Sequence, residues 1–247
     1  MAADNAHQFA LYVESLTKFL ETAKSCFIEL KDEAIIHRII HVLRLTANDH
    51  VTLFDSALHA SVLLKTIQKK SVGLEIINTQ KNQSYTPHIT FFFPLLKKDA
   101  FEAALYNLTA LGVQIIQIYA CTKTASFASY SHERAQRIMI AAAEQSKQFI
   151  IPEIRHAVTY SKLLQTHVAQ SFFFADQQGM HAYETITTLK SQNRTALTLM
   201  VGPEGDLTTA EKQDIASHAT LLRLTPTILR SEDALSLMTG MIRALFS

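Results

Sequence analysis

The sequence is poor in cysteine. Its 247 residues include only two, Cys26 and Cys121, which lie far apart and have no Cys-x-x-Cys spacing. Isolated cysteines are more typical of small buried side chains in a reducing compartment than of a disulfide scaffold or a metal site. We therefore assign no chemistry to either residue.

The sequence also lacks long hydrophobic runs and a targeting pattern. No apolar segment approaches the roughly 18 residues that a membrane-spanning helix needs. Residues 1–8 have no positively charged region followed by an apolar core, as a secretory signal would have. With 48% hydrophobic and 18% charged residues, the composition is that of an ordinary soluble globular protein. We expect a cytoplasmic protein without a membrane partner.

Neither sign of charge dominates, and several familiar motifs are missing. The 23 Lys and Arg residues and 22 Asp and Glu residues give a formal net charge of +1, so any nucleic-acid site must be a local basic patch. There is no Gly-x-Gly-x-x-Gly turn, nucleophile elbow or phosphate loop. His37 and His41 have i, i+4 spacing but lack the glutamate of a zinc-protease helix, so we expect no metal.

The pattern along the chain predicts two domains, residues 1–78 and 79–247. The first is β-rich, because short β-branched or aromatic segments alternate with turn residues, and a single helix interrupts them. We expect strands at Phe9–Val13, His50–Asp55, Ala60–Ile67 and Val72–Ile77, and a helix at Glu33–Leu45 capped by Asp32. Asn78–Pro87 is polar and lacks hydrophobic periodicity, which favours a linker.

The second domain is predicted to be α/β. Apolar strands alternate with helices, which indicates a mostly parallel sheet covered on both faces, and ligands of such sheets bind beyond the carboxyl ends of the strands. The expected strands are His88–Phe93, Val113–Ala120, Ser171–Ala175, Thr195–Val201 and Leu221–Leu224. The expected helices are Lys98–Leu111, His132–Phe149, Tyr160–Val168, Thr208–Ala219 and Glu232–Leu245.

Two segments near the end of the chain have the form of ligand-binding loops. In the first, a buried strand runs into Gly202-Pro-Glu-Gly205, and Thr208 or Thr209 can then cap a helix that has Glu211 in its first turn. Glycines let a backbone approach a ligand closely, and proline stiffens the loop. A tight strand-to-helix connection is the simpler explanation of this loop alone. The second segment, Leu221–Ala234, is another short strand, a proline-containing loop and a charged helix start, so the two loops together can form opposite walls of one pocket.

These segments resemble the SPOUT methyltransferases, and more narrowly the bacterial enzymes that methylate N3 of a uridine in 16S ribosomal RNA. That family shows Gly-Pro-Glu-Gly-Gly and Leu-Gly-x-x-Ile/Val-Leu-Arg-x-Glu-Thr-Ala, which match residues 202–206 and 224–234 here. Further similarity lies in His41–Leu45, Asn48-Asp49, Leu53–Asp55, Glu133-Arg134, Ala143–Gln145 and Ile151–Ile154, so it covers nearly the whole chain. Asp206, Thr225 and Asp233 depart from the family pattern.

The resemblance implies a small PUA-like β-barrel followed by a trefoil-knotted SPOUT α/β domain that binds S-adenosylmethionine. It places the cofactor in a slot between the two loops, formed by Met200, Val201, Gly202, Pro203, Glu204, Gly205, Leu224, Pro226, Ile228, Leu229 and Ala234. Leu224, Ile228 and Leu229 are hydrophobic, so packing in the core of a sheet explains them equally well.

The chemistry that the resemblance implies requires the N3 proton of the uridine to leave and the resulting negative charge to be stabilised. The base must also be unpaired or flipped so that its Watson–Crick edge is accessible. Arg230 can neutralise the charge, and Glu232 can accept the proton or orient the base. Alternatively, the two side chains form an ordinary surface pair near a helix start, where a carboxylate is favoured.

Partners follow from the same resemblance. We expect 16S ribosomal RNA, within the small ribosomal subunit, to be the substrate, with phosphate contacts drawn from Arg38, Arg44, Lys97, Lys98, Lys123 and Arg134. The family implies a homodimer, and the apolar closing helix Ala234–Phe246 suits either that interface or an intramolecular core. A SPOUT enzyme for another RNA position and a non-catalytic RNA-binding relative remain the alternatives.

Overall fold

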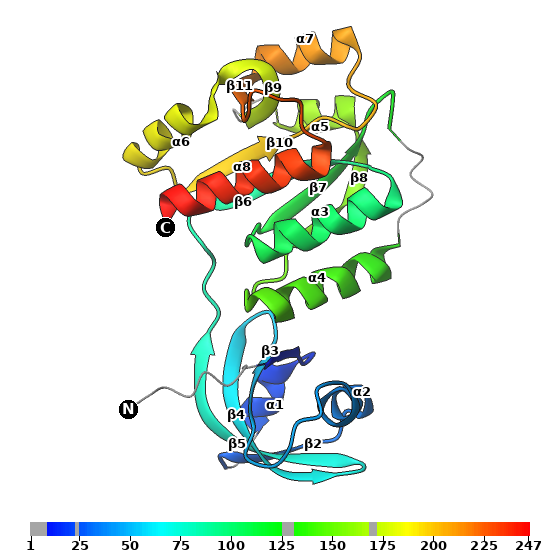
Figure 1. Cartoon of the computed structure of the whole chain (residues 1–247), viewed down its shortest axis with the longest axis vertical. Helices are drawn as coiled ribbons and strands as arrows, with labels where there is room; N and C mark the ends of the chain where they lie inside the picture. Colours follow the sequence, from blue (N-terminus) through cyan, green and yellow to red (C-terminus); the bar gives the residue numbers. More distant parts are fainter. Residues whose placement is uncertain (1–8, 23–24, 125–130, 168–171) are drawn as a thin grey trace. The chain divides into compact units, whose positions relative to one another are not determined.

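A computed structural model describes residues 9–22, 25–124, 131–167 and 172–247. The chain divides into two compact units (Figure 1). The first unit contains residues 1–83 together with 143–150, and the second contains residues 84–142 and 151–247. The boundary predicted after residue 78 lies inside a strand of the first unit.

The first unit is built on a five-stranded sheet with the order β1-β3-β4-β5-β2. Among its described strands, β1 pairs with β3 in parallel and the other pairs are antiparallel. The strands are β1 (Phe9–Tyr12), β2 (Phe27–Leu30), β3 (His50–Phe54), β4 (Leu58–Gln68) and β5 (Ser71–Lys81). Alternate residues of β3 and β4, such as Val51, Leu53, Val62 and Leu64, are fully buried and form the core with Ile39.

Two sequence expectations for this unit need correction. The predicted helix Glu33–Leu45 is a short α-helix, α2 (Glu33–His37), followed by a π-helical turn, η1 (Arg38–Val42); Asp32 caps it as predicted, its side chain accepting from the Ile35 amide. The predicted linker Asn78–Pro87 starts too early, because β5 stays paired with β4 as far as Lys81. Helix α1 (Leu16–Thr22) and strand β2 were not predicted.

The second unit is a six-stranded parallel sheet with the order β11-β9-β10-β6-β7-β8. Its strands are β6 (His88–Pro94), β7 (Ile115–Ala120), β8 (Glu153–Thr159), β9 (Phe172–His181), β10 (Ala196–Met200) and β11 (Ala219–Arg223). Its helices are α3 (Lys98–Ala110), α4 (His132–Ser146), α5 (Tyr160–His167), α6 (Ala182–Ser191), α7 (Thr209–His218) and α8 (Ser231–Phe246). The predicted α/β class is confirmed; β8 and α6 were not predicted.

Both faces of this sheet are covered, and β6 shows why its sequence is continuously apolar. Phe91 and Phe93 point into the core beneath α3 and α8, whereas Phe92 points into a second core with residues of α5 and α7. All three phenylalanines are fully buried. Successive side chains of a strand alternate between its faces, so a strand buried on both faces must be apolar throughout.

The chain order places a switch point in the middle of the sheet. From β6 the chain proceeds to β7 and β8 on one side, and it then crosses to form β9, β10 and β11 on the other, with β10 beside β6. Ligand sites of open parallel sheets form beyond the carboxyl ends of the strands at such a point. The loops that follow β6, β10 and β11 therefore meet at the edge where a site is expected.

Candidate functional site

A cavity of the second unit lies at this edge and has a volume of about 1540 Å³. It is bounded by the loops after β10 and β11, the start of α3, the middle of β9, and α7. Among the residues predicted to bind a cofactor, Val201, Gly202, Pro203, Glu204, Ile228, Leu229 and Ala234 line it. Both predicted catalytic residues, Arg230 and Glu232, line it as well. The two loops thus face one cavity, as the sequence predicted.

Four predicted cofactor residues are not among those that line the cavity: Met200, Gly205, Leu224 and Pro226. Met200 is fully buried in the core beneath the loop. Leu224 packs against the core on the other face of the sheet. Gly205 has a packing role, because a Cβ there would lie 3.1 Å from the carbonyl oxygen of Lys123.

The first loop is held by hydrogen bonds to three successive carbonyl groups. The buried phenol of Tyr119 donates to the Val201 oxygen at 2.7 Å, and the Ser231 hydroxyl donates to the Gly202 oxygen at 2.6 Å. The amide of Asp206 donates to the Pro203 oxygen at 3.0 Å. Because Ser231 starts α8, its bond joins the loop after β10 directly to the end of the loop after β11. Each of these carbonyls already has a donor, so the loop's conformation is set before a ligand arrives.

Asp206, where the resembling family has glycine, adopts a left-handed backbone with φ 59°. Aspartate tolerates this region better than most residues because its short side chain can bond locally. Its Oδ1 accepts from the Leu207 amide and its Oδ2 from Lys212 Nζ, at 2.8 and 2.6 Å. Burial raises the pKa of Asp206, but these bonds outweigh burial and hold the pKa below its usual value. The carboxylate therefore forms an ion pair at the rim of the cavity.

The second loop is ordered by its own threonines. Thr225, another departure from the family pattern, turns its hydroxyl to the Thr227 oxygen at 2.6 Å and does not line the cavity. Gln177, from β9, donates to the same Thr227 oxygen, also at 2.6 Å. Ile228 at the tip is 87% exposed although it is apolar. This loop therefore presents a hydrophobic side chain at the mouth of the cavity.

Glu232 and Arg230 differ sharply in exposure. The Arg230 side chain is 83% exposed and the Glu232 side chain 18%, with 4.0 Å between Arg230 Nη1 and Glu232 Oε1. Oε2 of Glu232 is buried and has no hydrogen-bond partner within the described residues. Buried carboxylate oxygens are normally paired, so one without a partner points to a ligand or proton that completes the site. The ordinary-surface-pair explanation does not account for this oxygen.

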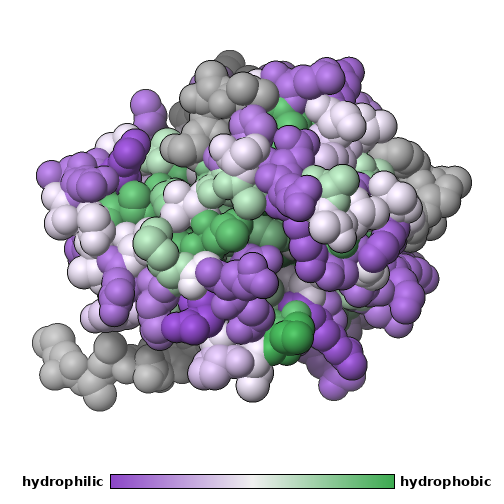
Figure 2. Space-filling view, turned by 90° about the horizontal axis from the view of Figure 1, so that it is seen from above, coloured by the Kyte–Doolittle hydropathy of each residue, from purple (hydrophilic) through white to green (hydrophobic). Residues whose placement is uncertain are grey.

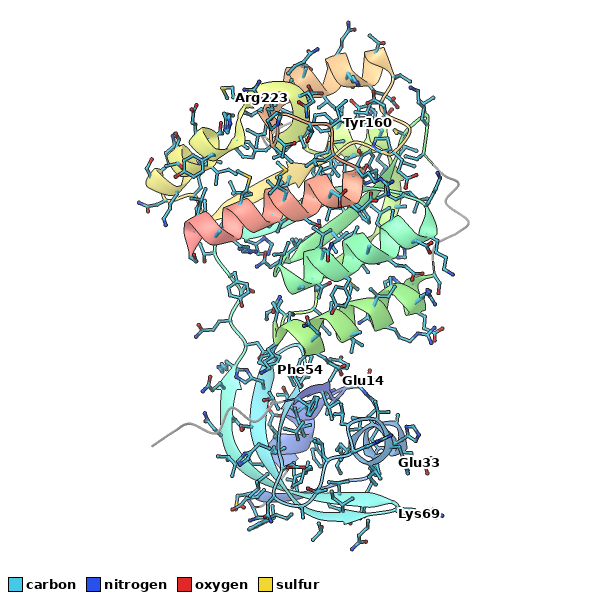
Figure 3. The ribbon with its side chains drawn as sticks, viewed as in Figure 1. Glu14, Glu33, Phe54, Lys69, Tyr160 and Arg223 are labelled. Atoms are coloured by element: carbon cyan, nitrogen blue, oxygen red, sulfur yellow. The ribbon has the colours of Figure 1, made fainter. Side chains whose placement is uncertain are left out.

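Helix α7 forms another wall of the cavity and is anchored at several points. Of the two predicted caps, Thr208 is the one that caps the helix, and it forms a capping box with Glu211. Glu211 also accepts from the amide and hydroxyl of Thr122, both at 3.0 Å. Tyr160, labelled in Figure 3, donates to the Glu211 carbonyl and Asp214 Oδ2, and burial raises its pKa. The wall that carries Lys212 is therefore rigidly placed.

The six predicted RNA-binding cations have different surroundings. Lys97 and Lys98 line the cavity, and Lys97 Nζ lies 3.4 Å from a Glu204 oxygen. Arg38 makes a bidentate pair with Glu144 inside the first unit, and Arg134 makes one with Glu102 in the second. Arg44 and Lys123 are exposed. Within the described residues, Lys97 and Lys98 are thus the predicted cations that lie at the cavity.

The surroundings of the cavity are amphipathic. Figure 2 shows hydrophobic side chains gathered near the centre of the face seen from above, with hydrophilic side chains around them. Among the cavity residues, Phe174, Leu221, Ile228 and Leu229 are apolar. A flat heterocycle with polar edges would match such a lining.

Sequence reasoning missed Tyr119, Ser231 and Gln177 as parts of the site. Each donates a hydrogen bond to a residue at least 29 positions away in the chain, so no local sequence pattern reveals its role. In the described ranges, no group of three or more His, Cys, Asp or Glu is arranged to hold a metal ion. Among these residues there is also no helix of the length and apolar character needed to cross a membrane.

Comparisons with known proteins find similarity to RNA methyltransferases. The family model described as an RNA methyltransferase domain matches residues 83–243. The chain is 27% identical over 230 residues to the ribosomal RNA small subunit methyltransferase E of Rickettsia conorii, covering 91% of this chain and 93% of that protein. It is 24% identical over 213 residues to the protein of the same name from Bacillus subtilis, covering 81% and 83%.

Solved structures show the same fold. A crystal structure of a ribosomal RNA small subunit methyltransferase E from Neisseria gonorrhoeae, bound to S-adenosyl methionine, has a TM-score of 0.78 at 22% identity. The match covers 97% of this chain and 98% of that one. A putative methyltransferase from Legionella pneumophila, solved with bound SAM, has a TM-score of 0.75 at 19% identity and covers 96% and 97%.

Proposed function

The chain belongs to the RNA methyltransferase domain family, and on this premise we propose that it transfers a methyl group from S-adenosylmethionine to N3 of a uridine in 16S ribosomal RNA. The observation that carries the proposal is the cavity whose two loops are joined by the Ser231–Gly202 bond and which is lined by Glu232, a carboxylate with one buried oxygen that has no partner among the described residues. Relatives named as small-subunit ribosomal RNA methyltransferases support the choice of substrate.

The residues present fit the cofactor. The cavity exceeds the roughly 300–1,000 Å³ of ordinary small-molecule sites, which leaves room for a cofactor and a nucleobase together. Val201–Glu204 and Ile228–Leu229 would hold the cofactor between the two loops. Pro203 stiffens the first loop, and Leu229 and Phe174 supply apolar surface for a ring. When bound, the cofactor supplies an electrophilic methyl group.

In the proposed mechanism, the protein positions the uridine and accepts its proton. The Glu232 carboxylate would accept the N3 proton, so that N3 can take the methyl group that the bound cofactor would supply. The exposed guanidinium of Arg230 offsets the negative charge that develops on the uracil oxygens. Lys97 and Lys98, which line the cavity, would contact RNA phosphates.

The finer assignments of fold and assembly belong to the same proposal. The first unit would be a PUA-like RNA-binding barrel, supported by its curved five-stranded sheet, and the second a trefoil-knotted SPOUT domain (Figure 1). We also propose a homodimer that acts in the cytoplasm on the small ribosomal subunit. In α8, Leu235, Met238 and Ile242 are buried in the core of the unit itself, so an interface would have to use other residues of this helix.

Two measurements test the proposed function. Mass spectrometry of small-subunit RNA from a deletion strain should show loss of N3-methyluridine, and the intact gene should restore it. An unchanged level of this nucleoside would refute the proposed substrate and favour another RNA position. Calorimetry with S-adenosylmethionine should show binding by the folded protein; if none is detected, the non-catalytic RNA-binding alternative is favoured.

The roles of Glu232 and Arg230 are tested by kinetics on small-subunit RNA. Removal of a general base typically costs about 10²- to 10⁴-fold, so Glu232→Gln should lower kcat within that range while cofactor binding persists. Arg230→Ala should lower kcat by a smaller factor, because an exposed cation is screened by water. Lys190→Ala, on the exposed surface of α6, is the control. Wild-type rates in both site variants would remove these residues from the mechanism.

A further inference from the structure

Two charged side chains that line the cavity have no task in the proposed mechanism. Asp206 follows the loop after β10, Lys212 lies on α7, and both line the cavity. Lys212 Nζ lies 2.6 Å from Asp206 Oδ2. Gln213 and Ala216 also line the cavity, so one face of α7 is turned towards it. The ion pair therefore belongs to the wall of the cavity.

The pair is held in place from both sides. The Asp206 backbone has its left-handed conformation, and its Oδ1 accepts from the Leu207 amide at 2.8 Å, which fixes the carboxylate on the loop. On the other side, the capping box at the start of α7 anchors the helix that carries Lys212. A charged pair that is oriented before a ligand arrives loses little conformational freedom when the ligand binds.

Both groups keep the capacity to bind a ligand. The Asp206 side chain is 63% exposed and the Lys212 side chain 43%. An ammonium group has three donors and a carboxylate has two oxygens with several acceptor sites, and the pair uses only part of these. Burial raises the pKa of Asp206, but Lys212 and the Leu207 amide lower it overall, so the carboxylate is ionised at neutral pH. The wall thus offers an anion and a cation side by side.

We infer that this pair receives the amino-acid end of the cofactor, with Lys212 binding the α-carboxylate and Asp206 the α-ammonium group. The inference rests on the proposed function. An α-amino acid carries both charges on one carbon, so it matches an acid and a base that already lie together. Asp206 is two residues beyond Glu204, at most about 7 Å along the chain, so a ligand that lies along Val201–Glu204 can reach it.

Two other ion pairs line the cavity and fit this role less well. Lys97 Nζ lies 3.4 Å from Glu204 Oε2, and the Lys97 side chain is 84% exposed, so this pair is longer and less firmly held. Arg230 and Glu232 are 4.0 Å apart and have tasks on the uridine in the proposed mechanism. The Lys97–Glu204 pair is therefore the rival that an experiment must exclude.

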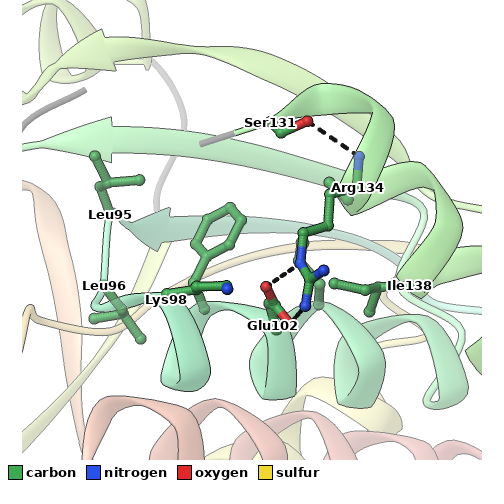
Figure 4. Close-up of a pocket in the computed structure, with 10 residues that line it drawn as sticks. Leu95, Leu96, Lys98, Glu102, Ser131, Arg134 and Ile138 are labelled. Carbon is green, nitrogen blue, oxygen red and sulfur yellow. Dashed lines mark hydrogen bonds and ion pairs between the residues drawn. The ribbon is translucent and has the colours of Figure 1, made fainter. Parts of the chain in front are cut away.

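A smaller pocket of the second unit does not adjoin the loops that would hold the cofactor (Figure 4). It has a volume of about 70 Å³ and a mostly apolar lining, and Arg134 at its rim bonds both carboxylate oxygens of Glu102. Among the described residues, its lining comes from the segment after β6, α3 and the start of α4, and includes neither the loop after β10 nor that after β11. The matching pair for a ligand held by those loops lies in the large cavity.

The test compares ligands with and without the amino-acid end. S-Adenosylhomocysteine and 5′-methylthioadenosine are both thioethers without charge on sulfur, and only the first carries an amino-acid end. Asp206→Asn keeps an acceptor for the Leu207 amide and tolerates the left-handed backbone, and Lys212→Met keeps the length of the side chain. Calorimetry should show that each variant binds S-adenosylhomocysteine about 5- to 10-fold more weakly than wild type, and 5′-methylthioadenosine within about 2-fold.

Decarboxylated S-adenosylmethionine separates the two contacts. It lacks the carboxylate but keeps the ammonium group, so Lys212→Met should weaken binding of S-adenosylmethionine about 5-fold and leave the decarboxylated compound nearly unaffected. Asp206→Asn should weaken binding of both compounds. If Lys212→Met weakens both equally, Lys212 does not bind the carboxylate and the assignment is overturned.

Two further variants control for charge and for the rival pair. Lys65→Met breaks an ion pair with Glu75 in the first unit that is similar in length and exposure, at 2.7 Å, and should leave the affinity for every ligand unchanged. Lys97→Met tests the rival. If Lys97→Met, and not Lys212→Met, causes the loss that depends on the amino-acid end, that end lies at Glu204 and the inference is refuted.

The outcomes separate this inference from the proposed function. If wild type binds both thioethers and neither Asp206→Asn nor Lys212→Met distinguishes them, the inference fails while dependence on the cofactor stands. If the predicted losses appear but small-subunit RNA is not methylated at uridine N3, the proposed substrate fails and the inference stands. If wild type binds none of the four compounds, the proposed cofactor fails and the inference fails with it.

Discussion

Replacement of Ser231 by alanine tests the idea that the two loops form one preorganised site. The Ser231 side chain is buried, and its hydroxyl makes a 2.6 Å bond to the Gly202 oxygen, which is the direct bond between the loops. Ser231→Ala removes the hydroxyl donor and leaves the Gly202 carbonyl without this hydrogen bond. The variant adds no bulk, so the geometry of the cavity should otherwise persist.

The expected size of the effect follows from this single bond. A typical hydrogen bond contributes about 1 kcal/mol, and leaving its partner unsatisfied in a partly buried place raises the cost to about 1–2 kcal/mol. If bound cofactor must restore the loop's order, this cost appears in the dissociation constant. At about 1.4 kcal/mol per factor of ten, S-adenosylmethionine should bind about 5- to 30-fold more weakly.

Isothermal titration calorimetry measures this change directly. Ser191→Ala is a matched control, because the Ser191 hydroxyl makes a 2.7 Å bond to the Thr188 oxygen at the exposed end of α6, away from the cavity. Circular dichroism should show the same secondary structure in both variants. If Ser231→Ala binds the cofactor as tightly as Ser191→Ala and wild type, the bond between the loops does not organise the site and the reasoning is refuted.

Three other predictions concern the supports of the site and of the first unit. Tyr119→Phe removes the donor beneath the first loop but keeps the ring, and calorimetry should show several-fold weaker cofactor binding; unchanged affinity would contradict this. Arg38→Met breaks the half-buried pair with Glu144 and should lower the free energy of unfolding by about 1–2 kcal/mol. In the same variant, RNA affinity measured by fluorescence anisotropy should stay within 2-fold, and a large loss would assign Arg38 to RNA. Because the folded pKa of Asp206 lies below its unfolded value, its pairing with Lys212 stabilises the fold above about pH 4 and is lost as the pH falls through the folded pKa. Thermal unfolding of Asp206→Asn should therefore differ from wild type at pH 7 and converge with it in acid; an equal difference at both pH values would contradict the assignment.

Local patterns predicted the elements whose signals lie within a few residues. The Asp32 cap formed as expected, and Thr208 is the one of the two predicted threonines that caps α7, because each cap needs only a side chain and an amide three residues away. Helix Glu33–Leu45 was predicted too long, since apolar spacing does not reveal that the helix changes to a π-helical turn at Arg38. The strand over Ser71–Lys81 was predicted too short because its polar end, Asn78–Lys81, is held by β4 rather than by its own composition.

Two departures from the family pattern, Asp206 and Thr225, show what local sequence patterns do not predict. The sequence shows that Asp206 and Thr225 carry side chains where the resembling family has glycine, but not where these side chains point. The structure turns the Asp206 carboxylate to Lys212 and the Thr225 hydroxyl to the Thr227 carbonyl. Neither direction follows from local spacing, because each depends on the exact backbone angles of the loop.

The sequence by itself determined the α/β class, the parallel sheet of the second unit and the two loops that face one cavity. It could do so because hydrophobic periodicity and glycine–proline turns act locally. Only the tertiary structure decided which groups support those loops and which cations remain at the cavity. Tyr119 reaches Val201 across 82 positions and Arg38 reaches Glu144 across 106, and such pairs exist only once the chain has folded.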